Sequence, residues 1–301
     1  MPPSPVLARP GQGRANPFPS DDDANAEIPP IRLRALSLGA GVQSTTMALM
    51  AAHGEIDPMP DSAIFADTGW EPRAVYEHLA WLRSSNVLPF PVHIVSAGDI
   101  RADLLRAGLG ERWASIPAFT RTIKRNRVEI GMIRRQCTKD YKIVPIRRKV
   151  RELVGLTRRR SPKTPVVEQW IGISLDEAIR MKPSFEAWQV NRWPLIEQRM
   201  TRNDCLRWLE RRGYPAPPKS SCTGCPFHSD TAWRRIRDGD PDAWADAVMV
   251  DRAIRTGLPG MRGEVFLHRS AVPLDQADLT TPEDHGQLDL WANECEGMCG
   301  V

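Results

Sequence analysis

Residues 35–46 read Ala-Leu-Ser-Leu-Gly-Ala-Gly-Val-Gln-Ser-Thr-Thr, and this stretch decides the fold that we expect. The apolar run at 31–38 predicts a β-strand, and the run at 47–52, Met-Ala-Leu-Met-Ala-Ala, predicts a helix. A glycine turn between strand and helix directs backbone N–H groups and the positive helix end at an anion, usually a phosphate. The candidate phosphate-binding residues are Ser37, Gly39, Gly41, Gln43, Ser44 and Thr45.

The glycine turn by itself leaves two interpretations open. It lacks the Gly-Lys-Ser/Thr of a Walker A loop, and Ser44 stands where the dinucleotide fingerprint has its third glycine. A glycine-rich turn without a ligand explains it as well as a phosphate site does. The remainder of the chain has to distinguish the two.

Strands and helices alternate along the chain from residue 31 onward. Further strands are expected at 62–66, 92–95 and 166–173, with an edge strand at 266–269; helices are expected at 44–53, 71–82, 99–107, 139–154, 229–238 and 241–256, and one begins near Thr201. Strands separated by helices of this length form a parallel sheet through right-handed crossovers. The predicted fold class is therefore α/β, a doubly wound parallel sheet with a cysteine-rich helical C-terminal region.

Small and polar residues follow the predicted strands at 39–44, 67–69, 96–99 and 172–177. In an open parallel sheet, ligands bind beyond the carboxyl ends of the strands, so these turns are expected to converge on one cleft. The Asp67 carboxylate could reach a ribose or a bound Mg²⁺, although an Asp-Thr-Gly turn is equally common where a helix simply begins. Asp67, Thr68, Gly69 and Gly172 join the candidate nucleotide-binding residues.

The composition, 41% hydrophobic and 26% charged over 301 residues, is typical of a globular protein, and no apolar run could span a bilayer. Residues 1–30 are rich in proline and acidic side chains, which predicts a disordered tail without a secretion signal, so we expect a cytoplasmic protein with no membrane partner. We expect a nucleotide-binding α/β domain over 31–200, a cysteine-knuckle helical region over 201–269, and a linker with a cysteine-containing tail over 270–301.

Basic residues are concentrated between Arg134 and Arg160, although the net charge of the whole chain is only +4. A cluster of this kind is typical of a solvated helix face and loop. It would also suit a polyanionic ligand, either a nucleotide or a nucleic acid.

Cysteines supply the second strong pattern. Cys222 and Cys225 are separated by two residues and followed by proline, a knuckle that binds zinc or an iron–sulfur cluster. Cys137 and Cys205 are the candidates that would complete a four-thiolate site, which we expect to hold a [4Fe–4S] cluster or, alternatively, Zn²⁺. Cys295, in the tail, is a candidate nucleophile if its pKa is lowered; it and Cys299 could equally be inert or extra ligands.

Four segments together carry a family likeness. Residues 39–44 resemble a modified PP-loop, residues 67–70 match an Asp-Thr-Gly-aromatic motif, residues 135–138 resemble an Arg-x-Cys-Cys segment, and residues 172–180 resemble a segment that lies near a sulfonucleotide. The chain thus resembles the phosphoadenosine phosphosulfate (PAPS) reductase family of the PP-loop, adenine-nucleotide α-hydrolase-like superfamily. Thr138 stands where cluster-bearing members have a second cysteine, so Cys205 would have to supply that thiolate.

The resemblance implies a fold, a substrate and a reaction. It implies that an adenine sulfonucleotide, PAPS or adenosine 5′-phosphosulfate (APS), binds at the turn, with Arg180 nearby. The Cys295 thiolate would attack the sulfonyl sulfur, and a thioredoxin-like dithiol would then release sulfite.

Two other functions remain open. The nucleotide could be ATP with Mg²⁺, cleaved to adenylate a small molecule or a nucleic acid held by the region between Arg134 and Arg160, with the cluster serving sulfur insertion. Alternatively, the chain could be a non-catalytic, zinc-stapled nucleotide-binding module.

Overall fold

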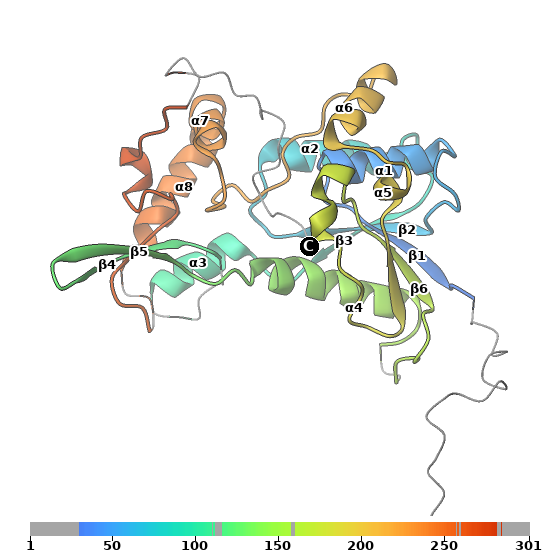
Figure 1. The fold of residues 1–301 in the computed structure, drawn as a ribbon, viewed down its shortest axis with the longest axis horizontal. Coiled ribbons are helices and arrows are strands. Elements are labelled where there is room, and N and C mark those ends of the chain that lie inside the picture. Colours follow the sequence, from blue (N-terminus) through green and yellow to red (C-terminus); the bar gives the residue numbers. More distant parts are fainter. Residues whose placement is uncertain are drawn as a thin grey trace, which may run out of the picture.

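The computed structural model describes residues 30–109, 111, 116–157, 160–256, 258, 260–281 and 284. A five-stranded parallel sheet lies at its centre, with strand order β3-β2-β1-β6-β7. The strands are β1 (Leu33–Ser37), β2 (Ser62–Asp67), β3 (Val92–Ser96), β6 (Val167–Trp170) and β7 (Gln189–Arg192) (Figure 1). The prediction of an α/β fold with a parallel sheet is confirmed, and β7 is a strand that the sequence pattern did not predict. Most of the predicted tail, residues 1–29, lies outside the described residues.

Helices cover both faces of this sheet, as a doubly wound fold requires. The helices are α1 (Val42–Ala52), α2 (Arg73–Leu82), α3 (Ile100–Gly108), α4 (Val144–Leu153), α5 (Pro194–Glu197), α6 (Arg202–Arg211), α7 (Asp230–Gly239) and α8 (Pro241–Ala253). Alternate strand residues point to opposite faces: Leu36 and Phe65 pack in a core with α1, α2 and α6, whereas Ala35 and Ile64 pack against Val150 of α4. None of the helices in the described ranges is long and apolar enough to cross a membrane.

A second, antiparallel sheet lies beside the first, with strand order β5-β4-β8. Its strands are β4 (Phe119–Lys124), β5 (Arg127–Met132) and β8 (Glu264–Phe266). The β4–β5 hairpin projects from the body as an arm (Figure 1). A second hydrophobic core, separate from that of the parallel sheet, is formed by residues of α3, α7, α8 and β8. The edge strand predicted near residue 266 is present, whereas the hairpin was not predicted.

The predicted helix at 139–154 is divided into two parts. Residues Thr138–Ile143 form a π-helix, and α4 continues from Val144. Cys137 lies directly before the π-helix, so its wider turn sets the position of that thiol.

Candidate functional site

The glycine turn between β1 and α1 is tightly enclosed by two other segments. A Cβ on Gly172 would lie 3.1 Å from the Ser44 backbone nitrogen, so a larger residue would have to push the turn after β6 away from α1 by a few tenths of an ångström. Ser220 closes the other side, where its Oγ donates a hydrogen bond to the carbonyl oxygen of Gly39. Ala40, between the two glycines, has a positive φ of 54°. Gly172 and Ser220, which are far from the turn in the sequence, therefore determine its shape.

The hydroxyl groups of Ser44 and Thr45, which follow the turn, do not cap α1, and the Thr45 hydroxyl lies in the core instead of the site. Ser44 Oγ accepts a hydrogen bond from Gly39 N at 3.1 Å, which stabilises the turn from inside. Thr45, a predicted phosphate ligand, is fully buried, and its Oγ1 lies 3.0 Å from His78 Nε2 in the core. The prediction for the Thr45 hydroxyl is therefore wrong, because the helix turns that side chain inward.

Gln43 links the turn to three other side chains. Its Nε2 donates to Glu177 Oε2 at 3.3 Å and to Ser174 Oγ at 3.4 Å. Its Oε1 accepts from Arg202 Nη1 at 3.1 Å, and Glu177 is also paired with Arg180 at 2.6 Å. Arg202 was missed by the sequence interpretation, where only the helix start at Thr201 pointed to this segment.

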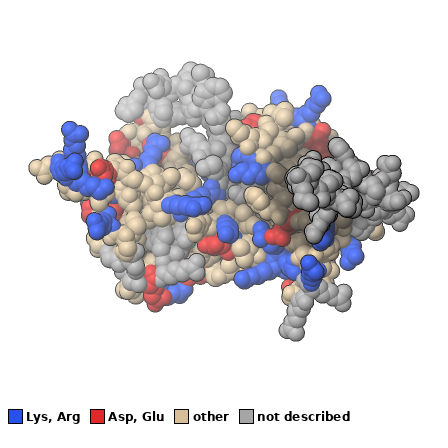
Figure 2. All heavy atoms as spheres, turned by 60° about the horizontal axis from the view of Figure 1, so that its bottom comes forward, with Lys and Arg blue, Asp and Glu red and all other residues tan. Residues whose placement is uncertain are grey.

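A cleft of about 1290 Å³ opens beside the glycine turn. It brings together most of the predicted nucleotide-binding residues, namely Ser37, Gly39, Gly41, Gln43, Ser44, Gly172 and Arg180. Arg134, Arg135 and Arg147 of the predicted basic region also line it, whereas Arg158 and Arg159 lie outside the described residues. The face turned forward in Figure 2 carries more basic than acidic side chains.

The second predicted turn, at 67–69, does not line this cleft. Asp67 Oδ1 accepts hydrogen bonds from Gly69 N and from the Tyr76 hydroxyl, both at 2.8 Å. Burial and the Asp67 carboxylate together raise the pKa of Tyr76. Asp67 and Gly69 shape the entry to α2, and Thr68 lies in a different cavity, so the structure does not place these three residues with the phosphate turn.

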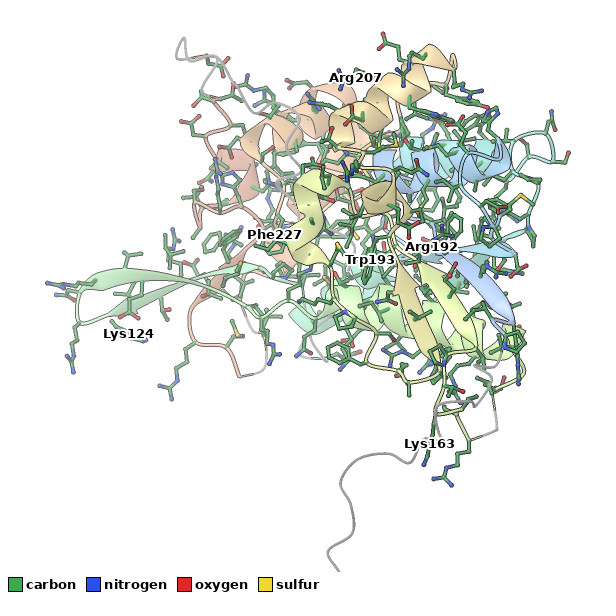
Figure 3. The ribbon with its side chains drawn as sticks, turned by 45° about the vertical axis from the view of Figure 1, so that its right-hand side comes forward. Lys124, Lys163, Arg192, Trp193, Arg207 and Phe227 are labelled. Carbon is green, nitrogen blue, oxygen red and sulfur yellow. The ribbon has the colours of Figure 1, made fainter. Side chains whose placement is uncertain are left out.

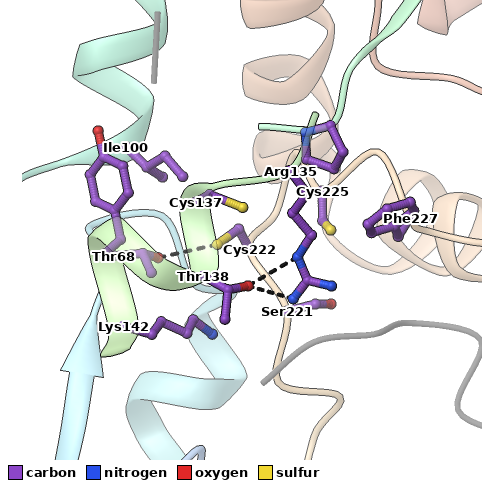
Figure 4. Close-up of a pocket in the computed structure, with 12 residues that line it drawn as sticks. Thr68, Ile100, Arg135, Cys137, Thr138, Lys142, Ser221, Cys222, Cys225 and Phe227 are labelled. Carbon is purple, nitrogen blue, oxygen red and sulfur yellow. Dashed lines mark hydrogen bonds between the residues drawn. The ribbon is translucent and has the colours of Figure 1, made fainter. Parts of the chain in front are cut away.

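That different cavity, of about 40 Å³, is lined by three of the predicted cysteine ligands, Cys137, Cys222 and Cys225 (Figure 4). Thr68 Oγ1 lies 3.2 Å from Cys222 Sγ, and Ser221 contributes a buried hydroxyl that has no hydrogen-bond partner. Burial raises the pKa of the Cys222 thiol to about 12, with the nearby Glu71 carboxylate acting in the same direction. A bound metal would have to displace that proton.

The knuckle that carries Cys222 and Cys225 is fixed by its neighbours. Thr223 N donates to the Trp70 carbonyl oxygen at 2.8 Å, and a Cβ on Gly224 would lie only 1.9 Å from the Trp70 ring. His228 Nε2 lies 3.0 Å from the Cys222 carbonyl oxygen, and burial lowers the pKa of His228 to about 4. A neutral His228 therefore donates to the knuckle backbone and is a support for the loop rather than a metal ligand.

Cys205 does not belong to the three-cysteine cavity. It is fully buried on α6, in the core that α6 shares with α1. Burial raises the pKa of Cys205 to about 12. The predicted set of four ligands is therefore wrong at this position, because the apolar face of α6 takes the thiol into the core. Cys295 and Cys299 lie outside the described residues.

Glu71 lies next to the cysteines and was not singled out from the sequence as a site residue, whereas Lys142 belongs to the family likeness that begins at residue 135. The Glu71 side chain is fully buried; its Oε1 accepts from Thr68 at 3.1 Å and lies 3.4 Å from Lys142 Nζ, while its Oε2 has no hydrogen-bond partner. Glu71 Oε1 also lies 3.9 Å from Cys222 Sγ. Glu71 was predicted only as the first residue of the helix at 71–82, so its buried carboxylate was missed.

The nucleotide turn and the cysteine cavity are parts of one continuous region. Ser220 contacts Gly39 in the cleft, and the next two residues, Ser221 and Cys222, line the cysteine cavity. Arg135, Thr138 and Lys142 line both spaces. Within the described ranges, however, no group of three or more His, Cys, Asp or Glu side chains is arranged to hold a metal ion. No protein-family model matches the chain, and no curated protein matches it.

Proposed function

We propose that this protein is a PAPS-reductase-like enzyme, which binds an adenine sulfonucleotide and reduces its sulfonyl group to sulfite. The observation that carries the proposal is the continuity of the two spaces, in which residues 220–222 lead directly from the glycine turn to the cysteines. We place this activity in the cytoplasm and assign the cysteine-bearing segment after residue 200 to the sulfur chemistry.

The cleft residues would bind the phosphates and the sulfonyl group. The backbone N–H groups of Gly41 and of the first turn of α1 would hold a phosphate, as glycine turns at helix N-termini do, while the Gly39 N–H keeps its bond to Ser44 Oγ. Gln43, together with its partner Arg202 and with Arg180, which pairs with Glu177, would bind further oxygens of the nucleotide, because all three side chains line the cleft.

The proposed reaction proceeds in two balanced steps. The Cys295 thiolate attacks the sulfonyl sulfur, an S–S bond forms, and the bond between that sulfur and the phosphate oxygen breaks, so the nucleotide leaves with its electron pair. A thioredoxin-like dithiol then supplies two electrons; it becomes a disulfide, sulfite is released, and Cys295 returns to the thiol.

A metal centre belongs to the same proposal. Thiolates from Cys137, Cys222 and Cys225 suit a [4Fe–4S] cluster or Zn²⁺, and the unpartnered Ser221 hydroxyl is consistent with a group in the cavity. Such a centre would hold the knuckle and the segment before the π-helix together beside the cleft. Because Cys295 is assigned to the attack on sulfur and Cys205 is excluded, Cys299 is the remaining cysteine that could complete a four-thiolate set.

The reaction is tested by following sulfite release from PAPS and APS with a dithiol reductant. Cys295→Ser is expected to abolish the release, while Cys205→Ala, a change of a core thiol on α6, is the matched control and keeps it. An unchanged rate in Cys295→Ser would contradict this mechanism. Melting temperatures with PAPS, APS and ATP–Mg²⁺ then show which nucleotide binds.

The metal proposal has its own test, which is the iron and zinc content of anaerobically purified protein. Serine at 137, 222 or 225 is expected to lower the content, and Cys205→Ala is expected to leave it unchanged. Serine at 299 is expected to lower the content as well, whereas serine at 295 leaves it unchanged, which separates the ligand from the nucleophile. A wild-type protein that contains neither metal contradicts the site.

A second candidate function is favoured by the size and charge of the cleft. With about 1290 Å³, the cleft exceeds the range of roughly 300–1,000 Å³ that is usual for small-molecule sites. ATP with Mg²⁺ would then be cleaved between its α and β phosphates to adenylate an acceptor for sulfur insertion. Pyrophosphate release that rises when RNA or DNA is added is the expected result, and no release with any nucleic acid contradicts this candidate.

A third candidate, a zinc-stapled module that binds a nucleotide without catalysis, shares the same residues. It predicts a colourless protein with zinc, a melting shift with a nucleotide, and no turnover. Turnover in either of the two assays above excludes it.

A further inference from the structure

We infer that the outer part of the cleft binds single-stranded nucleic acid, with Phe185 as a platform on which an unpaired base stacks. The inference rests on the second candidate function for its chemistry, because it names the class of the acceptor. The binding itself needs neither ATP nor the metal, so it is measured separately. Three features of the described residues carry it: charge, an exposed aromatic ring and a rigid loop.

The charge of the cleft lining is almost entirely of one sign. Among the described residues that line it, ten are lysine or arginine and a single one, Glu186, is acidic. They come from segments well separated in the sequence, with Arg134 and Lys139 before α4, Lys182 before β7, and Arg235 on α7. A groove with this charge follows a phosphate backbone over several nucleotides, beyond what a single nucleotide requires.

Phe185 is the exposed aromatic ring at this cleft. Its side chain is 94% exposed although it lines the cleft, and the neighbouring cleft residue Ile179 is 95% exposed. Exposure of this kind leaves the face of the ring open, and every nucleic-acid base has a flat face that stacks on such a ring. Duplex ends and interiors keep their bases paired, so an unpaired strand is the better fit.

The loop that carries Phe185 is held in place on both sides of the ring. Glu186 Oε1 lies 2.9 Å from Arg147 Nη1, and its Oε2 accepts from Trp188 Nε1 at 2.9 Å. Ser184 Oγ accepts from the Glu186 backbone nitrogen at 3.1 Å, and the Lys182 carbonyl oxygen accepts from Asn191 Nδ2 at 2.9 Å. Because these interactions hold the loop, Phe185 keeps its outward position in the free protein. Binding of a base would therefore cost little conformational entropy in this loop.

The test is fluorescence anisotropy with labelled single-stranded oligonucleotides of about 12 nucleotides, DNA in one arm and RNA of the same sequence in the other. Phe185→Ala is expected to weaken binding about tenfold, while Phe185→Tyr retains it, since both rings stack. Ile123→Ala, an exposed apolar change on the hairpin arm, is the matched control and leaves binding unchanged.

The charge contribution is tested by salt dependence. Lys139→Gln and Lys182→Gln are each expected to reduce the slope of log affinity against log salt by about 0.7, whereas Lys163→Gln, outside the cleft lining, does not (Figure 3). Equal competition by polyglutamate overturns the assignment to nucleic acid. Binding that depends on Lys124 and Arg127 at the hairpin tip instead of the cleft also overturns it.

A last comparison separates this inference from the proposed nucleotide site. Phe185→Ala is expected to leave the melting shift caused by a mononucleotide unchanged. An equal loss of mononucleotide and oligonucleotide binding would assign the ring to the nucleotide and overturn the inference. Oligonucleotide binding without any mononucleotide shift would instead contradict the proposed nucleotide site alone.

Discussion

Gly224 shows at the scale of one residue how the cysteine knuckle is packed. A Cβ added here would lie 1.9 Å from a rigid carbon of the Trp70 ring, so one of the two segments must move. We predict that Gly224→Ala lowers the free energy of unfolding by about 1–3 kcal/mol and lowers the metal content. Gly239→Ala, where no atom lies within 4 Å, is the control for denaturation and metal analysis. Equal stability of the two variants would contradict the packing argument.

Two buried histidines predict a pH dependence of stability. Burial lowers the pKa of His78 and of His228 to about 4, from 6.5. Between these values the unfolded chain binds more protons, so stability is full above pH 6.5 and falls as the pH decreases towards 4. Each histidine contributes on the order of 3 kcal/mol to this loss.

Chemical denaturation at a series of pH values between 7 and 4 measures this effect. His78→Gln keeps a partner for the Thr45 hydroxyl but cannot titrate, and it is therefore expected to have a shallower pH dependence than the wild type. An unchanged slope in this variant would show that His78 does not stay neutral in the folded protein.

Residue identity predicted the glycine turn because there the backbone carries the chemistry. Gly39, Gly41 and Gly172 could be identified because strand ends and glycine turns follow from the pattern. The roles of Thr45 and Cys205 could not, since hydroxyl and thiol groups suit both a site and a core. The direction of the side chain decides between them, and that depends on packing with distant segments.

The start of α6 matters at the scale of an element, because the next residue, Arg202, reaches Gln43. Thr201 and Asp204 form a capping box, in which Asp204 N donates to Thr201 Oγ1 at 3.2 Å. We predict that Thr201→Ala costs about 1 kcal/mol of stability and also weakens nucleotide binding, because the first turn that carries Arg202 loosens.

The matched control for this helix cap is Asp240→Ala at the start of α8, where Asp240 Oδ1 accepts from Ala243 N at 3.0 Å. A similar loss of stability without a change in nucleotide affinity is expected, measured by melting and by nucleotide titration. An equal effect of both variants on affinity would show that α6 has no special role.

Elements with a strong hydrophobic period could be predicted, and those without it could not. β1 and β2 carry mostly buried apolar residues, since helices cover both of their faces, and β6 is marked by Val167 and Trp170. The β5 strand has every residue exposed, and β7 is short and mostly polar, so neither has the pattern of a buried strand. β5 pairs with its immediate neighbour β4 in a hairpin, so its exposure rather than a distant partner explains why it was missed, whereas β7 pairs with β6 across the intervening segment 171–188.

At the scale of the whole molecule, the second core is held by one buried carboxylate. Asp251 of α8 is fully buried, and it accepts hydrogen bonds from Leu267 N at 2.8 Å and Leu274 N at 3.0 Å, besides pairing with Arg255. Burial raises the pKa of Asp251. The carboxylate therefore joins the segment after β8, at Leu267 and Leu274, to α8.

We predict that Asp251→Ala lowers stability by about 3–5 kcal/mol, since Arg255 would lose its buried partner. Asp242→Ala, an exposed change on the same helix, is expected to cost no more than about 1 kcal/mol. Urea denaturation measures both. A small effect of Asp251→Ala would show that the second core does not depend on this carboxylate.

The hydrogen bond from Ser220 to Gly39 has a consequence for how the two spaces respond to each other. A ligand on the glycine turn acts on the carbonyl that Ser220 contacts, and Cys222 is only two residues further along the chain. If phosphate binding changes the affinity of the thiols for a metal, thermodynamic linkage requires the metal to change nucleotide affinity by the same factor. Metal binding at the cysteines and nucleotide binding at the turn would then be coupled through the contact between Ser220 and Gly39.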